Sequence, residues 1–149
     1  MRYAIFGAAA ISMLALGCRN APARSHETCV KEAIFAMQRA TERITNASDY
    51  DGVLAALESL RIETGKLVTL REEFAAFGEP SSWERSRMRQ HRSLFASAKE
   101  KWAAAMTVMR RRLDDREFPP DVRQKLDDAL SEFDAERKRT YEAIEPFWN

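Results

Sequence analysis

The residues best suited to bind a metal ion are two histidines and two cysteines, His26, His91, Cys18 and Cys29. His26 and Cys29 are three positions apart, so on a helix they share a face and could bind a soft divalent ion. A closed zinc site takes about four protein ligands, and only Cys18 and His91 remain to complete it. We therefore predict no metal site and no cofactor. Cys29 is expected to be a small buried residue, and His91 a hydrogen-bonded residue at or near the core.

Motifs for catalysis are missing from the sequence. It contains no Gly-x-Ser-x-Gly elbow, no glycine-rich phosphate loop and no Cys-x-x-Cys-His haem motif. Carboxylates are abundant, as in Asp114-Asp115 and Asp127-Asp128, but they alternate with arginines and lysines. Such mixed charges at helical spacing are typical of a solvated helix surface. The sequence therefore predicts that the protein is not an enzyme.

Five residues form a predicted interaction set. Arg85, Arg89 and Arg92 are spaced by four and three positions, so a single helix carries them on one face. Such a face can bind anionic lipid, a cell-wall polymer or an acidic protein, although ion pairing with neighbouring acidic helices is the simpler interpretation. Trp83 and Trp148 lie near expected helix ends, where they either cap the core or stay exposed for a partner.

The first 18 residues, MRYAIFGAAAISMLALGC, have the features of an export signal. Arg2 supplies a positive charge, and an uncharged apolar run extends from Tyr3 to Gly17. As a helix this run reaches about 22 Å at 1.5 Å per residue, which is short of the roughly 30 Å of a bilayer core. The run is therefore typical of a cleaved signal, not of a membrane span.

The end of the leader, Leu14-Ala15-Leu16-Gly17-Cys18, resembles the lipobox of bacterial lipoproteins. In that family a dedicated peptidase cuts before a cysteine that carries diacylglycerol. The resemblance therefore implies cleavage between Gly17 and Cys18 and acylation of Cys18. Ala15 and Leu16 stand in swapped order relative to the pattern that the family favours.

The lipobox resemblance implies a protein on the periplasmic face of the bacterial cell envelope, held to the lipid bilayer through acylated Cys18. In lipoproteins, an aspartate directly after the cysteine resembles an inner-membrane retention signal. This chain has Arg19 at that position, so the outer membrane is favoured. An ordinary secretory signal, cut after Ala21-Pro22-Ala23, is the alternative. That cut discards Cys18 and releases a soluble secreted or periplasmic protein.

Charge and length suggest one neutral exported domain. The whole chain has a formal net charge of +1, and Arg2 is the one charged residue of the leader, so residues 18–149 carry no net charge. A neutral exported domain is not expected to bind nucleic acid. We divide the chain into a cleaved signal peptide over 1–17, a tether over 18–26 and a single helical domain over 27–149.

From residue 27 onward, apolar residues recur at steps of three and four, which predicts helices. We expect helices over about 27–47, 49–77, 82–117 and 120–145, with capping boxes at Ser48 with Asp51 and at Ser81 with Glu84. Gly65 lies within the second of these, where a glycine can mark a kink or a close helix crossing; simple tolerance is favoured over a functional hinge, and the sequence leaves open whether the helix bends. The predicted fold class is all-α, an antiparallel bundle of about four helices, or two helical hairpins, after an N-terminal signal helix.

Together, the leader and a domain without catalytic motifs predict a membrane-tethered, non-enzymatic helical module. Such an adaptor or scaffold acts through contacts with another cell-envelope protein. One alternative is a small-ligand or metal-binding bundle that uses His91 and Met88, and another is a periplasmic chaperone-like protein. The sequence leaves the oligomeric state open.

Overall fold

The computed structural model describes residues 24–114 and 117–148. Within them lie five α-helices and a short 3-10 helix (Glu145–Phe147), and no strand. The helices are α1 (His26–Asn46), α2 (Tyr50–Ala76), α3 (Ser82–Arg89), α4 (Arg92–Asp114) and α5 (Pro120–Ile144). The all-α class is thus confirmed. The predicted signal helix, the cleavage site at Gly17 and the lipidation site at Cys18 lie outside the described residues.

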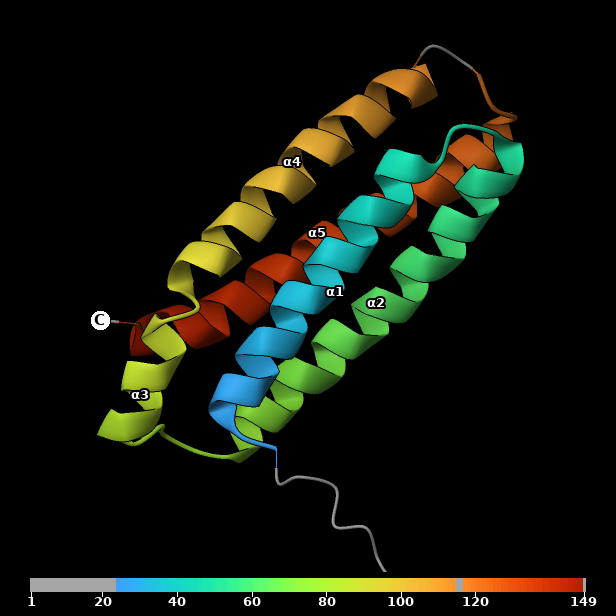
Figure 1. Cartoon of the computed structure of the whole chain (residues 1–149). Helices are drawn as coiled ribbons and strands as arrows, with labels where there is room; N and C mark the ends of the chain where they lie inside the picture. Colours follow the sequence, from blue (N-terminus) through green and yellow to red (C-terminus); the bar gives the residue numbers. More distant parts are fainter. Residues whose placement is uncertain (1–23, 115–116, 149) are drawn as a thin grey trace, which may run out of the picture.

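The four long helices lie side by side, and α3 closes one end of the bundle (Figure 1). α2 packs against α1 and α5, whereas α4 packs mainly against α1 and has few contacts with α5. The neighbours α1 and α4 run parallel, as do α2 and α5 (Figure 1). A simple antiparallel bundle therefore does not describe the packing. The physical reason for the parallel neighbours is the position of α3. This helix carries the chain across the end of the bundle and places α4 beside α1.

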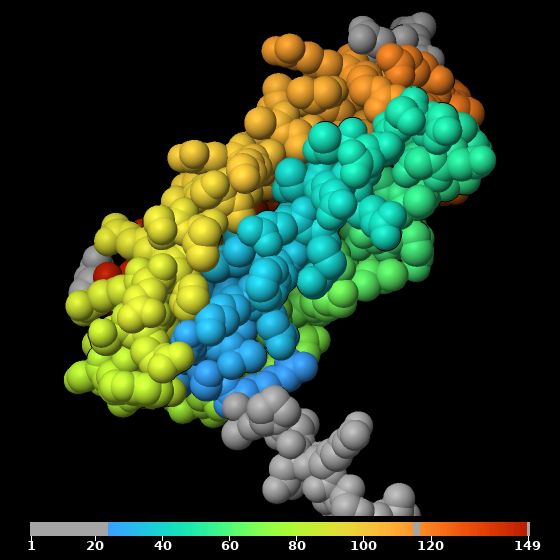
Figure 2. All heavy atoms as spheres, in the orientation of Figure 1, coloured from blue at the N-terminus to red at the C-terminus, as the bar shows by residue number. Residues whose placement is uncertain are grey.

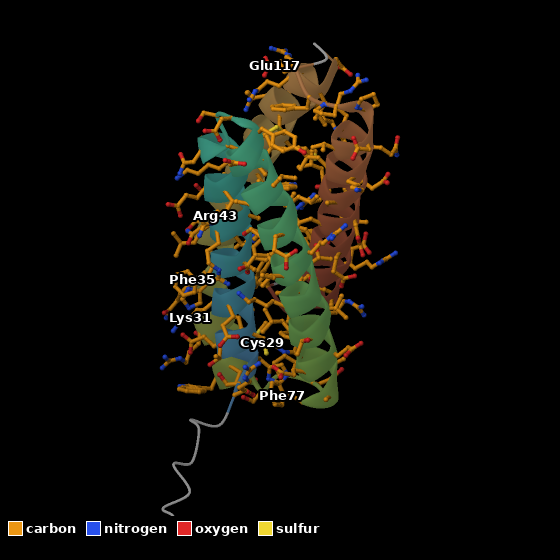
Figure 3. The ribbon with its side chains drawn as sticks, turned by 90° about the vertical axis from the view of Figure 1, so that its right-hand side faces the viewer. Cys29, Lys31, Phe35, Arg43, Phe77 and Glu117 are labelled. Atoms are coloured by element: carbon orange, nitrogen blue, oxygen red, sulfur yellow. The ribbon has the colours of Figure 1, made fainter. Side chains whose placement is uncertain are left out.

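We call this end of the bundle the α3 end. It contains α3, the start of α1, the end of α2 and the end of α5 (Figure 1). The space-filling view shows α1 between α4 and α2, with α3 beside the start of α1 (Figure 2). In Figure 3, Phe77 lies at the α3 end and Glu117 at the opposite end.

The core is one continuous apolar cluster built from the predicted stripes of the four long helices. At its middle, the Trp102 ring of α4 packs 4.4 Å, centroid to centroid, from Phe133 of α5. The Trp102 indole N–H donates to Asp134 Oδ1 at 3.0 Å, so its polar atom is satisfied. The largest fully buried side chains include Trp102, Phe95, Phe133, Met37, Leu60, Leu67, Met88 and Met109.

Two ion pairs connect neighbouring long helices. Arg39 of α1 donates two hydrogen bonds, at 2.9 and 2.8 Å, to the buried Glu63 carboxylate of α2. Arg71 of α2 donates to the buried Glu136 of α5 at 2.6 Å. Each buried carboxylate therefore has an arginine partner, as burial of a charge requires.

The single helix predicted over 82–117 is wrong, because the chain forms α3 and α4 with a tight turn between them. In that turn the Gln90 N–H bonds the Arg87 carbonyl at 3.2 Å, and the His91 N–H bonds the Met88 carbonyl at 3.0 Å. Neither residue at the break is glycine or proline. The break instead follows from tertiary contacts, since Met88 is fully buried and His91 turns toward Glu27 of α1.

Two helix starts differ from the prediction. His26, which we assigned to the tether, is the first residue of α1, and Ser25 caps the helix by accepting from the Thr28 N–H at 3.2 Å. The fold therefore begins before residue 27. At α2, the cap is Asp49, not Ser48, and its carboxylate accepts from the Gly52 N–H at 2.8 Å.

The capping box of Ser81 with Glu84 is confirmed at the start of α3. On α2 and at its end, two large apolar side chains stay partly exposed, Leu54 at 39% and Phe77 at 41%. Gly65 lies within the continuous α2, and a Cβ at this position meets no atom within 4 Å. No close helix crossing therefore requires a glycine at this position.

Candidate functional site

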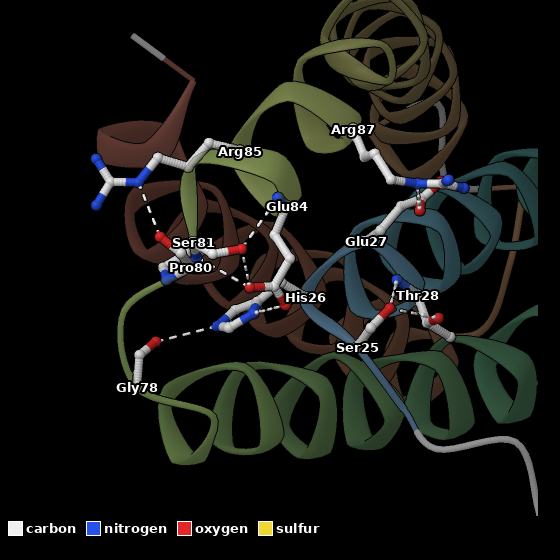
Figure 4. A network of polar contacts seen from close by, with 10 residues as sticks. All are labelled: Ser25, His26, Glu27, Thr28, Gly78, Pro80, Ser81, Glu84, Arg85 and Arg87. Atoms are coloured by element: carbon white, nitrogen blue, oxygen red, sulfur yellow. Dashed lines mark hydrogen bonds and ion pairs between the residues drawn. The ribbon is translucent and has the colours of Figure 1, made fainter.

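Both histidines of the chain lie at the α3 end, and His26 is the more buried of the two. Its Nδ1 lies 2.9 Å from Glu84 Oε1, and its Nε2 lies 3.0 Å from the Gly78 carbonyl oxygen (Figure 4). The Glu84 carboxylate and the Gly78 carbonyl are both hydrogen-bond acceptors, so a ring nitrogen of His26 that carries a proton donates to the one it faces. The ring also packs edge-on against Phe74 at 4.9 Å. His26 thereby joins the start of α1 to α3 and to the end of α2.

Glu84 uses its two carboxylate oxygens for different purposes. Oε1 faces His26, and Oε2 accepts from the backbone N–H of Ser81 at 2.9 Å and from the Ser81 hydroxyl at 2.8 Å. The hydrogen bond from His26, followed by those from Ser81, lowers the pKa of Glu84 to about 2. Glu84, which completes the capping box with Ser81, thus also holds α3 against α1.

Gly78 lets the chain leave α2 and turn toward α3. It has φ +75°, a left-handed conformation that glycine adopts without a Cβ penalty. No atom crowds the position of its missing Cβ, so the backbone angle is the reason for a glycine here. This turn directs the Gly78 carbonyl toward His26.

A second polar cluster surrounds Glu27, the residue after His26. Its carboxylate accepts from Arg87 of α3, from Lys31 at 2.7 Å and from His91 at 3.1 Å. These hydrogen bonds, Arg87 first, lower the pKa of Glu27 to about 2. Consecutive residues of α1 therefore bind the two ends of α3, His26 at its start and Glu27 at its end. His91 is hydrogen-bonded at the edge of the core, as predicted.

The outer side of α3 carries an aromatic ring and arginines. Trp83 is 66% exposed, and the Arg87 guanidinium carbon lies 4.9 Å from the centre of its ring. Arg89 is also exposed, near the end of the helix. We call Trp83, Arg87 and Arg89 the α3 surface. Its first turn lies at the lower tip of the molecule in Figure 1.

The structure separates the five residues of the predicted interaction set. Arg85 donates to the Pro80 carbonyl at 3.0 Å and lies 5.5 Å from the Phe147 ring centre, so it stabilises the α2–α3 connection. Arg92 belongs to α4, because the helix breaks before it. Trp148 is 4% exposed and packs 5.3 Å from Phe95, so it caps the core. Of the five residues, Trp83 and Arg89 are the ones that are exposed on α3.

The structure gives Cys29 and His26 separate roles. Cys29 is buried between α1 and α2 (Figure 3), and burial raises the pKa of its thiol to about 11. It is therefore the small core residue that we predicted, and a weak nucleophile. Both nitrogens of His26 are engaged with Glu84 and Gly78. Within residues 24–114 and 117–148, no group of three or more His, Cys, Asp or Glu side chains could hold a metal ion.

A groove of about 390 Å³ runs between α1 and α4, away from the α3 surface. Most of its lining residues are small or apolar, and two of them are cationic. The lining residues are Thr41, Ile44, Thr45, Lys101, Ala104, Ala105, Val108, Met109 and Arg112. Sequence reasoning did not identify this groove, because it depends on the parallel packing of α1 and α4.

Sequence reasoning also missed the pairing of His26 with Glu84. The capping box identified Glu84 as a helix-start residue, but nothing in the spacing of 58 positions connects it with His26. The one available clue was the amphipathic pattern of the helix that follows, which places His26 one turn before the buried Val30.

No protein-family model, characterised protein or solved structure matches this chain in the three comparisons made. None of the helices in the described part of the chain is long and apolar enough to pass through a membrane.

Proposed function

We propose that the protein is a lipoprotein of the bacterial cell envelope whose helical domain acts as a non-enzymatic interaction module. The observation that carries this proposal is the leader, whose end at Leu14–Cys18 resembles a lipobox. α1 begins at His26, a short distance along the chain from Cys18, which supports a domain held close to the bilayer. Acyl chains contribute about 0.8 kcal/mol per buried methylene, so several chains together give stable anchoring.

The contacts at the α3 end support a binding role over a catalytic one. A general base needs an atom that faces the substrate. The nitrogens of His26 face Glu84 and Gly78, and the carboxylate of Glu27 faces Arg87, Lys31 and His91. These groups stabilise the arrangement of helices, which gives a rigid surface for contact with a partner.

The proposed partners are the bilayer, through acylated Cys18, and a second envelope protein. Large apolar side chains on the outside of α1 and α4 offer contacts for such a protein. Phe35, Leu94 and Val108 are each more than half exposed. The favoured location is the periplasmic face of the outer membrane, and a soluble secreted protein is the alternative.

Intact mass spectrometry of the mature protein from a bacterial membrane fraction tests the proposal. The wild-type protein is expected to begin at Cys18 and to carry the mass of its acyl chains. Cys18→Ser is expected to lose this mass and to leave the membrane fraction. Cys29→Ser is the matched control, because it removes the buried thiol and leaves acylation unchanged. A soluble protein that begins at Arg24 contradicts the proposal.

The two alternative functions have less support. A ligand or metal site at His91 and Met88 conflicts with the position of these residues, since Met88 is fully buried and His91 is bonded to Glu27. A chaperone-like protein requires a dimer with a concave basic face. Analytical ultracentrifugation tests this requirement, and a strictly monomeric protein contradicts it.

A further inference from the structure

The α3 end is the end of the bundle nearest the membrane if Cys18 carries the lipid, and this orientation rests on that proposed function. The chain from Cys18 to Arg24 reaches at most about 22 Å, at roughly 3.6 Å per residue. Arg24 bonds Glu73 near the end of α2, so the chain enters the fold at the α3 end. The 27 residues of α2 alone measure about 40 Å. The opposite end of the bundle is therefore too far from Arg24 for the tether to bring it as close to the bilayer.

The α3 surface has the chemistry of a membrane-interface contact. Tryptophan is enriched at the membrane–water interface because its ring is apolar and its N–H is polar. Arginine binds phosphate oxygens through several N–H donors and is attracted to anionic lipids. Trp83 and Arg87 stack on each other, and Arg89 lies on the same short helix.

The α3 surface itself contains two arginines and no acidic residue, and carboxylates of other segments lie around it. The Glu84 carboxylate is turned inward to His26 and Ser81, and Glu27 is bonded to Lys31 as well as to Arg87. Glu79 lies in the α2–α3 loop, 3.7 Å from Arg85. Other carboxylates at this end include Glu32 of α1 and Glu73 of α2, which both pair with Arg24. Glu72 of α2, Glu142 of α5 and Glu145 of the 3-10 helix also lie there.

The position of α3 is fixed before any contact with a membrane. His26 holds its first turn and Glu27 holds its last turn, so the α3 surface does not have to be ordered on binding. A preformed surface avoids much of the entropic cost of association.

We infer that the α3 surface docks on the anionic phospholipid headgroups of the bilayer that holds Cys18. The Trp83 indole inserts at the level of the headgroups, and Arg87 and Arg89 bind lipid phosphates. The bundle then stands on its α3 end, and the α1–α4 groove faces the periplasmic space beside it.

Fluorescence quenching by brominated lipids tests this contact. The acylated protein is purified from membranes and reconstituted into vesicles of phosphatidylglycerol and phosphatidylcholine whose acyl chains carry bromine, which quenches an indole on contact. We expect part of the tryptophan emission to be quenched and this part to disappear in Trp83→Phe. Trp102 and Trp148 are 0% and 4% exposed, so their emission stays unquenched. In vesicles of phosphatidylcholine alone, the quenched part is expected to shrink.

A charge variant with a matched control tests the role of the arginines. Arg89→Gln is expected to lower the ratio of docked to undocked protein about fivefold, which corresponds to one arginine near an anionic surface. Arg111→Gln removes the same charge from an exposed position near the other end of α4, and it is expected to change nothing. An equal loss in both variants overturns the assignment of docking to α3.

The same samples distinguish acylation of Cys18 from docking of the α3 surface. For this purpose the intact mass of the protein and its flotation with vesicles are measured in parallel. Acylated protein that floats with vesicles but shows no quenching of Trp83 overturns docking by α3 and leaves lipidation in place. A protein partner that covers α3 is then the alternative. A protein without acyl chains overturns both proposals.

Discussion

The middle of the bundle and the α3 end are held together by different forces. In the middle, the Trp102 ring fills the space between α4 and α5 against Phe133, and the contact is almost entirely apolar. At the α3 end, His26 and Glu27 hold α3 through charged and hydrogen-bonded groups. The comparison shows that one short chain can rely on apolar packing at the Trp102–Phe133 contact and on ionisable groups at the α3 end, while ion pairs such as Arg39–Glu63 also join the long helices. The four predictions that follow test this division.

The largest effect is expected from Trp102→Ala. Removal of a fully buried indole leaves a cavity at the seam between α4 and α5, where few other residues meet. We expect the free energy of unfolding to fall by about 3–5 kcal/mol, measured by denaturant unfolding followed by circular dichroism. Trp83→Ala is the control, because Trp83 is exposed, and a change within about 0.5 kcal/mol is expected. Similar losses in both variants would contradict the assignment of stability to the core.

A smaller and more local effect is expected from His26→Ala. The variant removes the imidazole that lies between the Glu84 carboxylate and the Gly78 carbonyl, which costs roughly 2–3 kcal/mol. Hydrogen exchange is expected to show lost protection in α3 and in the α2–α3 loop, with α5 near Phe133 unchanged. His91→Ala is the control, since Glu27 keeps Arg87 and Lys31 in that variant. Equal loss of protection along all helices would show that the α3 end is not a separate region.

The stability of the α3 end should decrease in acid. Glu27 and Glu84 have folded-state pKa values of about 2, below the ordinary 4.5, because Arg87 bonds the first and His26 the second. Their ionised forms therefore stabilise the fold above about pH 4.5, and this contribution is lost as the pH falls toward 2. We expect Tm to fall over this interval and to fall less in Glu84→Gln. Trp102→Ala should lower Tm at every pH, because the cavity that it leaves does not depend on the ionisation of Glu27 or Glu84.

The smallest effects come from two glycines and have opposite signs. Gly78→Ala forces a side chain into a left-handed backbone conformation at the α3 end, and we expect a loss of about 1 kcal/mol. Gly65→Ala places a methyl group in open space on α2, and we expect a gain of up to about 1 kcal/mol. Thermal unfolding of both variants in parallel checks the prediction. A loss at Gly65 would mean that α2 needs its flexibility there.

The core was predictable because it depends on spacing within each helix. Steps of three and four along the sequence identify Phe95, Trp102 and Phe133 as inward-facing residues, and all three are fully buried. The cap of α3 was predictable for the same reason, since Ser81 and Glu84 interact across one turn. Local periodicity and local capping chemistry therefore specify the helices and their buried faces.

The packing of the helices and the α3 end were not predictable, because they depend on contacts across the fold. The break between α3 and α4 contains Gln90 and His91, which do not stop helices by themselves. It forms because Met88 is buried and His91 reaches Glu27. The separation of Arg92 from Arg89 is a consequence of this break. The pairing of His26 with Glu84 likewise requires α3 to have crossed the end of the bundle.

The crossing of α3 also has a consequence for the speed of folding. The bond from His26 to Glu84 spans 58 positions, and the bond from Arg71 to Glu136 spans 65. In a bundle where each helix packs beside the next, most contacts close short loops, and such proteins fold quickly. Here the main pairing of consecutive long helices is the α1–α2 hairpin, because α4 and α5 share few contacts. The pairs α1–α4 and α2–α5 close long loops, and the chain entropy lost in closing them opposes their formation. The bundle is therefore expected to start from the α1–α2 hairpin and to fold more slowly than an up-and-down bundle of equal length.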